Sequence, residues 1–259
     1  MRALRSYLAF LAVLLTTGGI ANAQVLRPLE PLDDGVVRYF IAPPLAEAAA
    51  LPADEELAAW AFESWQRAGD GAFKFVRVSN EDEALVRLYW VAPGGGQYGE
   101  MRPLVVGGRR GAAVYIRPDT TALGPEISER ARVDALFRDT VVYLTCVHEL
   151  GHALGLSHTA EFADIMYFFG FGGDIGEFFD RYRRRLKERG DISAASALSA
   201  GDLAQLSALY GRKPIPGQRT ALNYLKSKAF AVGAPCARFR GPVQCRAWPT
   251  TGRSSAAFF

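Results

Sequence analysis

Residues 148–158 read His148-Glu-Leu-Gly-His-Ala-Leu-Gly-Leu-Ser-His158, and they constrain the structure more than any other part of the chain. This segment holds all three histidines of a 259-residue sequence. On a helix, His148 and His152 share one face, because side chains four residues apart are neighbours there. Gly155 predicts a sharp backbone turn that ends the helix and brings His158 back towards the other two. The pattern therefore predicts three imidazoles that converge on one metal ion.

The donor set indicates a catalytic zinc site rather than a structural one. Three nitrogen ligands leave a tetrahedral zinc ion one open position, whereas a structural site usually has four protein ligands. Glu149 lies about 100° around the helix from His148, beside the ion, where it can act as general base on a zinc-bound water. A site that only stores metal would not need this carboxylate. We predict His148, His152 and His158 as zinc ligands and Glu149 as the catalytic residue.

The residues around the motif predict a sheet in the first half of the domain and helices in the second. A helix is expected between Pro52 and Gly69, with Trp60 and Trp65 as core anchors, and a longer one over 132–157. The glycine-rich stretch 92–100 is interpreted as a connection, because it lacks the lysine of a phosphate-binding loop. Runs rich in β-branched and aromatic residues predict strands at 36–42, 73–78, 84–91, 103–108 and 111–118.

The composition and the N-terminus limit the classes of protein to which the chain can belong. A hydrophobic content of 49% with a net charge of +3 excludes a disordered chain and gives no sign of a nucleic-acid partner. Residues 1–23 are typical of a signal peptide: Arg2 and Arg5 precede a short apolar run and an Ala-Asn-Ala cleavage pattern. No stretch is long enough for a transmembrane helix. We expect an exported protein, secreted or periplasmic, whose oligomeric state the sequence does not indicate.

Further motifs on both sides of the zinc segment resemble those of a known protein family. Thr159 follows the third histidine, and Met166 lies in Asp-Ile-Met-Tyr, which resembles a Met-turn. Residues 198–211 match the closing-helix pattern L-S-x-x-D-x-x-x-[IL]-x-x-L-Y-G, and residues 61–65 resemble A-F-x-x-W. Over about residues 36–211 the chain resembles a metzincin metalloprotease of the matrixin type, and its spare architecture resembles that of bacterial members.

The resemblance implies a fold and an activity. The fold is α+β of the zincin type, with a twisted, mostly parallel five-stranded sheet and an antiparallel edge strand packed on three main helices. The edge strand is expected in or near Pro103–Gly108, where an extended protein or peptide substrate adds as a further strand. The implied activity is hydrolysis of peptide bonds. The implied organisation is a signal peptide (1–23), a catalytic domain (24–211) and a C-terminal tail (212–259).

The chain also departs from the family pattern. No cysteine precedes Cys146, which itself is expected in the core, so the cysteine-switch latency of many matrixins has no counterpart. Phe168 stands where matrixins usually have proline, which leaves open the shape of the S1′ wall beside the residue after the scissile bond. No histidine remains for a second, structural zinc. Calcium is neither indicated nor excluded.

Two segments lie outside the family pattern. Residues 167–197 form an insertion in which Asp174 and Gly190 bracket a helix with an apolar stripe of Ile175, Phe178, Phe179, Tyr182 and Leu186. Its other side is basic, with Arg181, Arg183, Arg184, Arg185, Lys187 and Arg189. The favoured interpretation is a helix that packs on the domain with a solvated basic face. The alternatives are a lid or specificity wall over the S1′ side that attracts acidic substrates, and a helix that contacts anionic membrane surfaces. The tail carries nine Lys/Arg and no acidic residue, and a disulfide between Cys236 and Cys245 is an open alternative to free thiols there.

Two other functions stay open at this point. One is a non-catalytic adhesion or binding protein that keeps zinc, against which the intact Glu149 argues. The other is a zinc hydrolase that acts on a non-peptide bond, against which the expected edge strand argues. A zinc-dependent endopeptidase is the function that the residues favour.

Overall fold

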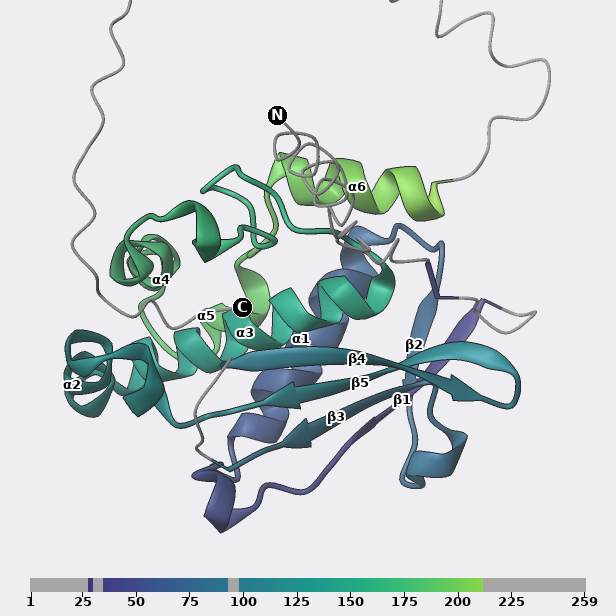
Figure 1. Cartoon of the computed structure of the whole chain (residues 1–259), viewed down its shortest axis with the longest axis horizontal. Coiled ribbons are helices and arrows are strands. Elements are labelled where there is room, and N and C mark those ends of the chain that lie inside the picture. Colours follow the sequence, from purple (N-terminus) through teal and green to yellow (C-terminus); the bar gives the residue numbers. More distant parts are fainter. Residues whose placement is uncertain (1–27, 30–34, 93–97, 212–259) are drawn as a thin grey trace, which may run out of the picture.

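The computed structural model describes residues 28–29, 35–92 and 98–211 (Figure 1). Five strands form one sheet in the order β2-β1-β3-β5-β4. The strands β1, β2, β3 and β5 are parallel, and β4 runs antiparallel to β5 at one edge. Their bounds are β1 Val36–Ile41, β2 Lys74–Arg77, β3 Val86–Trp90, β4 Gly99–Val106 and β5 Arg109–Ile116. The sheet confirms the predicted fold class.

The helices that cover the sheet enclose the core. α1 (Asp54–Ala68) packs against β1 and β2, and α3 (Ala135–Leu154) lies beside it against β4 and β5 (Figure 1). Trp65 is fully buried between these layers, as predicted, whereas Trp60 is only half-buried beneath the guanidinium of Arg189. The other helices are α2 Pro125–Val133, α4 Ile175–Arg183, α5 Asp191–Ala194 and α6 Ala200–Tyr210, with 3₁₀ turns at Ala46–Ala48, Glu81–Glu83, Thr120–Leu123 and Phe169–Phe171.

The long helix begins later than its sequence pattern predicts. The expected span 132–157 crosses Asp134, whose backbone is extended (φ −122°, ψ 95°) and separates α2 from α3. The side chain of Asp134 accepts a hydrogen bond from the backbone N–H of Phe137 at 3.0 Å, so it caps α3. At the other end, Gly155 takes a left-handed conformation (φ 99°) after Leu154. The predicted start was therefore wrong and the predicted turn is confirmed.

The edge strand is longer than the predicted 103–108. β4 starts at Gly99, inside the stretch 92–100 that was interpreted as a connection, and ends at Val106. Gly107 and Gly108 form the hairpin turn with positive φ values of 56° and 79°, which favour glycine. The correction matters because the newly assigned part of β4 is the part nearest Glu149.

The insertion 167–197 packs on the domain through its apolar stripe. Phe178, Phe179, Tyr182 and Leu186 are buried, and Asp174 caps α4 by accepting a hydrogen bond from Glu177 N–H. The helix ends at Arg183, so Gly190 does not stop it but precedes α5. On the basic side, three arginines form ion pairs, which are Arg183–Asp134, Arg184–Glu177 and Arg189 with both Asp139 and Glu56. These pairs favour the packed helix over a lid that attracts acidic substrates.

Some predictions fall outside the described residues. The signal peptide 1–23 and the tail 212–259, with Cys236 and Cys245, are among them. Cys146 is described and is buried in the core, as predicted. In the described part of the chain, no helix has the length and apolar character needed to cross a bilayer.

Candidate metal centre

The helix α3 presents the motif from the centre of the domain. Nearly all of its residues from Thr140 to Leu154 are buried, because it is enclosed by the sheet, α1 and the insertion. The indole N–H of Trp65 donates to the carbonyl of Val147 at 2.8 Å, immediately before the first histidine. This buried hydrogen bond couples α1 to the segment that carries the motif, so the position of His148 depends on the core itself.

The three histidines meet as predicted. Nε2 of His158 lies 3.3 Å from Nε2 of His148 and 3.0 Å from Nε2 of His152. Nδ1 of His148 lies 2.6 Å from the carbonyl oxygen of Ile165, and Nδ1 of His152 lies 3.0 Å from that of Leu156. Because a carbonyl only accepts, each Nδ1 must carry the proton and each Nε2 must present a bare lone pair.

The geometry fits a zinc ion. The bare Nε2 lone pairs of His148 and His152 converge on Nε2 of His158, and nitrogens that meet in this way suit a cation between them. In a tetrahedral site with Zn–N bonds of about 2.0–2.1 Å, the nitrogens lie about 3.3 Å apart, close to the separations found here. Burial lowers the pKa of His148 and His158, and it lowers that of His152 to about 4. The imidazoles are therefore neutral near pH 7, as metal ligation requires.

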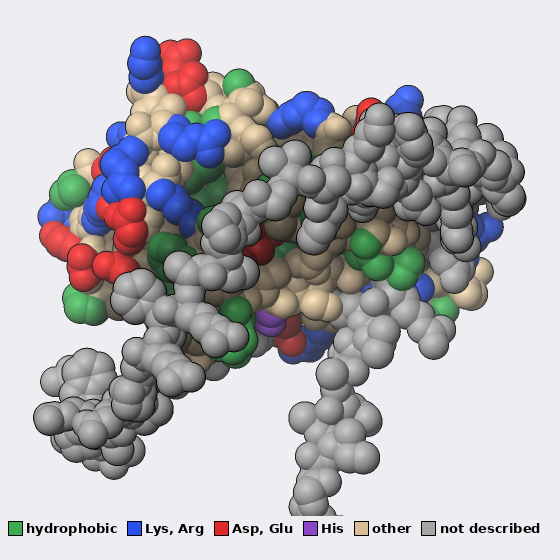
Figure 2. Space-filling model, turned by 90° about the horizontal axis from the view of Figure 1, so that it is seen from above, with side chains coloured by type: hydrophobic (Ala, Val, Ile, Leu, Met, Phe, Trp, Pro, Cys, Tyr) green, Lys and Arg blue, Asp and Glu red, His purple; other side chains and the backbone are tan. Residues whose placement is uncertain are grey.

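The site opens to solvent on the side of the third histidine. His148 is buried, with 2% of its surface exposed, whereas His152 is half-buried and His158 is exposed. Figure 2 shows a histidine side chain at the surface, close to acidic and basic side chains. A substrate can therefore reach the convergence point of the nitrogens from outside, while the first ligand position stays fixed in the core.

Glu149 lies next to the edge strand rather than among the nitrogens. Its side chain is 2% exposed, and a Cβ built on Gly99 would come within 2.6 Å of its Oε1. Burial, together with the negative charge of Glu100, raises the pKa of Glu149 to about 8. Gly99 was missed by the sequence reasoning, because a glycine in a glycine-rich stretch carries no signal of what it faces.

A Met-turn lies beneath the histidines, at the predicted Met166. A Cβ on Gly151 would lie 2.4 Å from the sulfur of Met166, so the helix passes this side chain at close range. The turn is held by Asp202, whose carboxylate accepts from the backbone N–H of Ile165 at 2.9 Å and of Met166 at 3.3 Å. Asp202 also accepts from Ser199 N–H at 2.8 Å and completes a capping box at the start of α6. The sequence pattern contained Asp202 but did not reveal this role.

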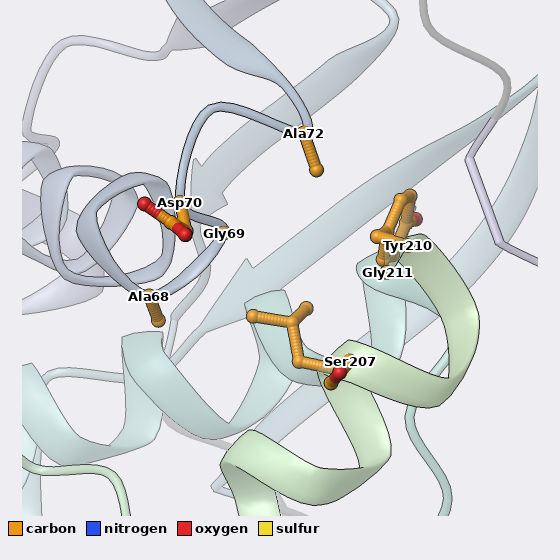
Figure 3. Close-up of a pocket in the computed structure, with 8 residues that line it drawn as sticks. Ala68, Gly69, Asp70, Ala72, Ser207, Tyr210 and Gly211 are labelled. Carbon is orange, nitrogen blue, oxygen red and sulfur yellow. The ribbon is translucent and has the colours of Figure 1, made fainter. Parts of the chain in front are cut away.

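A separate pocket of about 540 Å³ lies between the end of α1 and α6 (Figure 3). None of the predicted site residues lines it. Figure 3 shows Asp70 from the turn after α1 on one side and Ser207 and Tyr210 of α6 on the other. The candidate metal centre is therefore distinct from this pocket.

A family model for the matrixins matches residues 42–171, half of the chain, and the match includes all three histidines and Glu149. The chain belongs to the matrixin family. Matrixins are zinc-dependent peptidases, so membership makes this matrixin a metallopeptidase that acts on peptide bonds. It also agrees with the sheet order and the Met-turn described above.

Other comparisons add little to this assignment. Among solved structures, myroilysin aligns with 13% identity over 71% of this chain and 83% of its own, with a TM-score of 0.32. At these values the likeness supports no argument about the site. No curated protein matches the chain.

Proposed function

We propose that this matrixin is an exported zinc-dependent endopeptidase, with His148, His152 and His158 as zinc ligands and Glu149 as general base. The observation that carries the proposal is the convergence of three Nε2 atoms beside a buried carboxylate, at the free edge of a sheet. Each part serves peptide hydrolysis: a cation site, a proton acceptor and a strand to which an extended chain can pair.

The chemistry divides between the ion and this chain's own carboxylate. A zinc ion held by the histidines would acidify a water molecule and polarise the carbonyl of the scissile bond. Glu149 accepts the proton of the attacking water and then delivers it to the leaving amine. Its pKa of about 8 is near neutral, which suits a group that must both take and give a proton. Burial keeps bulk water from competing for this proton.

The direction of the backbone groups along β4 defines where a substrate would pair. The backbone N–H of Arg117 donates to the carbonyl of Tyr98 at 3.0 Å, which makes them a hydrogen-bonded pair in the ladder with β5. Because such pairs alternate with outward-facing residues, Gly99, Met101 and Pro103 direct their backbone groups to the free edge. Pro103 has no N–H, so its place on the outer side leaves the ladder intact.

Two of the outward-facing donors, Gly99 and Met101, lie at the active-site end of β4, whereas Val105 lies near its other end. Gly99, which lies against Glu149, and Met101 each offer an N–H and a C=O group, and Pro103 offers only a carbonyl. We therefore expect an extended peptide to pair with Gly99 and Met101, so that its scissile bond lies between β4 and the histidines. Peptide-bond specificity in this proposal rests on main-chain pairing, which a small non-peptide ester would not make.

Hydrolysis of an unfolded protein substrate by the purified chain tests the proposal. Glu149→Gln should lose activity by about 10³-fold and still bind one equivalent of zinc, because only the proton transfer is removed. Glu126→Gln, at an exposed glutamate of α2, is the matched control and should keep full activity. Equal cleavage by the parent and by Glu149→Gln would overturn the assigned role of Glu149. Zinc binding without cleavage by the parent would favour a binding protein instead.

Export is the remaining part of the proposal. The charged, apolar and small-residue segments of residues 1–23 support it. Intact mass measurement on protein recovered outside the cytoplasm should give a chain that starts at Gln24. A chain that keeps residues 1–23 would contradict cleavage.

A further inference from the structure

The three histidines are not held in the same way. His148 and His152 each lie within hydrogen-bond distance of a backbone carbonyl through Nδ1, that of Ile165 for the first and that of Leu156 for the second. Among the described residues, Nδ1 of His158 has no hydrogen-bond partner, and its side chain is the most exposed of the three. A histidine ligand without such a partner can rotate its imidazole ring until the metal binds. Fixing the ring at that moment costs free energy, so the affinity for the metal is lower.

An aromatic ring takes the place of the missing hydrogen bond. The ring of Phe168 stacks on the imidazole of His158 with a centroid distance of 4.9 Å and an interplanar angle of 28°. The two segments are joined by backbone hydrogen bonds, from Phe168 N–H to the carbonyl of Thr159 at 3.1 Å and from Thr159 N–H to that of Met166 at 2.8 Å. These bonds pair Thr159 with Tyr167 in a parallel bridge, so the backbone fixes Phe168 directly after the residue that faces Thr159.

Gly170 leaves the space in which the ring of Phe168 lies. A Cβ on Gly170 would lie 2.0 Å from Cε1 of that ring, so only glycine leaves room for it. Gly170 does not have a positive φ, so space rather than backbone conformation requires the glycine. Phe171 meets the ring of Phe168 edge-on at 5.6 Å and is itself 64% exposed. Phe171 therefore contacts the ring of Phe168 and is not a member of the stacked pair with His158.

We propose that Phe168 is a positioning residue that holds His158 in the orientation for zinc binding, and that Gly170 provides the space for it. This inference rests on the proposed role of His158 as a zinc ligand. Stacking restricts the rotation of the imidazole before the ion arrives, as the backbone carbonyls do for the other two histidines. Loss of an outer partner of a ligating histidine lowers metal affinity by about 10- to 100-fold.

Zinc affinity of the full chain, measured by competition with a chromophoric chelator, tests the proposal. Phe168→Ala should weaken zinc binding about tenfold, and Gly170→Ala should do the same by displacing the ring. Phe168→Tyr keeps the ring and should bind zinc like the parent. Phe171→Ala removes a neighbouring exposed ring and is the matched control, expected to stay within about twofold of the parent.

A second readout reports on the stacked pair itself. The chain has only three histidines, so its imidazole NMR signals are few and assignable. A stacked ring shifts the protons of His158 upfield, and in the metal-free protein Phe168→Ala should move the signals of His158 while those of His148 and His152 stay in place. Weaker zinc binding with unchanged signals of His148 and His152 locates the effect at His158, whereas a general structural role of Phe168 would move the signals of all three histidines.

The outcomes are separable from those of the proposed function. Parent-like zinc affinity in both Phe168→Ala and Gly170→Ala would overturn the inference and leave the zinc site intact. Parent-like zinc affinity in His158→Ala would overturn the ligand assignment on which the inference rests. Unfolding measurements on the metal-free variants guard against a general loss of structure, which Phe168→Tyr avoids in any case.

Discussion

Asp202 connects the closing helix to the metal centre, and its replacement by alanine is a sensitive test of the site. Its carboxylate is fully buried and accepts backbone hydrogen bonds from Ile165, Met166 and Ser199. The carbonyl of Ile165 lies 2.6 Å from Nδ1 of His148. One peptide unit therefore separates the carboxylate from a predicted zinc ligand, although Asp202 lies 54 residues after His148 in the sequence.

The expected loss of stability follows from the groups that Asp202→Ala leaves without a partner. Two buried N–H groups in the Met-turn become unpaired, at about 1–3 kcal/mol each. The half of the capping box that the Asp202 carboxylate supplies, its bond from Ser199 N–H, is lost as well, at about 1 kcal/mol. The free energy of unfolding should fall by about 4 kcal/mol, a large share of the roughly 5–15 kcal/mol typical of a domain.

Urea denaturation of the metal-free protein, followed by circular dichroism, measures this change without the contribution of bound zinc. Asp119→Ala is the control, because Asp119 also caps a helical turn by accepting from Thr121 N–H but does so at the surface. It should lose about 1 kcal/mol. A loss in Asp202→Ala no larger than that of the control would refute the reasoning. Zinc affinity should fall in Asp202→Ala alone, since only this variant releases the peptide that orients His148.

Three further predictions concern the substrate edge, the space around Glu149 and pH. Met101→Pro removes the outward N–H that follows Gly99 along β4 and should lower kcat/KM about tenfold. Val105→Pro removes an outward N–H farther along β4 and should leave kcat/KM unchanged. Equal effects of the two substitutions would contradict the proposed pairing of the substrate with Gly99 and Met101. Gly99→Ala should reduce activity at least tenfold with zinc content unchanged, because its Cβ would meet Glu149 Oε1 at 2.6 Å; full activity would contradict this. The lowered pKa of the histidines, about 4 for His152, means that the unfolded chain binds more protons between about pH 6.5 and 4. The metal-free protein should therefore lose stability as the pH falls through this range. A free energy of unfolding that does not change with pH would contradict the burial of neutral histidines at this site.

Much of the fold could be predicted because the sequence patterns that indicate its strands and its histidine helix are local. The strands β1, β2, β3 and β5 lie within two residues of their predicted positions at each end. The spacing of the histidines and the turn at Gly155 follow from helix geometry alone. Periodicity did not reveal the break at Asp134, because α2 and α3 join through a single capping residue.

The errors arise where a residue depends on distant partners. Gly99 belongs to a strand because β5 pairs with it, and nothing in a glycine-rich stretch predicts that pairing. Arg183 and Arg189 of the insertion pair with Asp134 and Asp139, about 50 residues away in sequence, so these two side chains are held by partners that the sequence pattern does not reveal, while Arg185 and Lys187 are exposed as predicted. Phe168 could be recognised as a departure from the family, but its stacking on His158 requires the three-dimensional path of the turn.

The central claim is that His148, His152 and His158 together hold one zinc ion. Because the chain has no other histidine, histidine-selective ¹H–¹⁵N NMR during zinc titration into the metal-free protein tests it directly. The account predicts that the Nε2 signals of all three imidazoles shift together and stop shifting at one equivalent of zinc, while Nδ1 of His148 and His152 stays protonated. Shifts in fewer than three imidazoles, or saturation at a different stoichiometry, would contradict it.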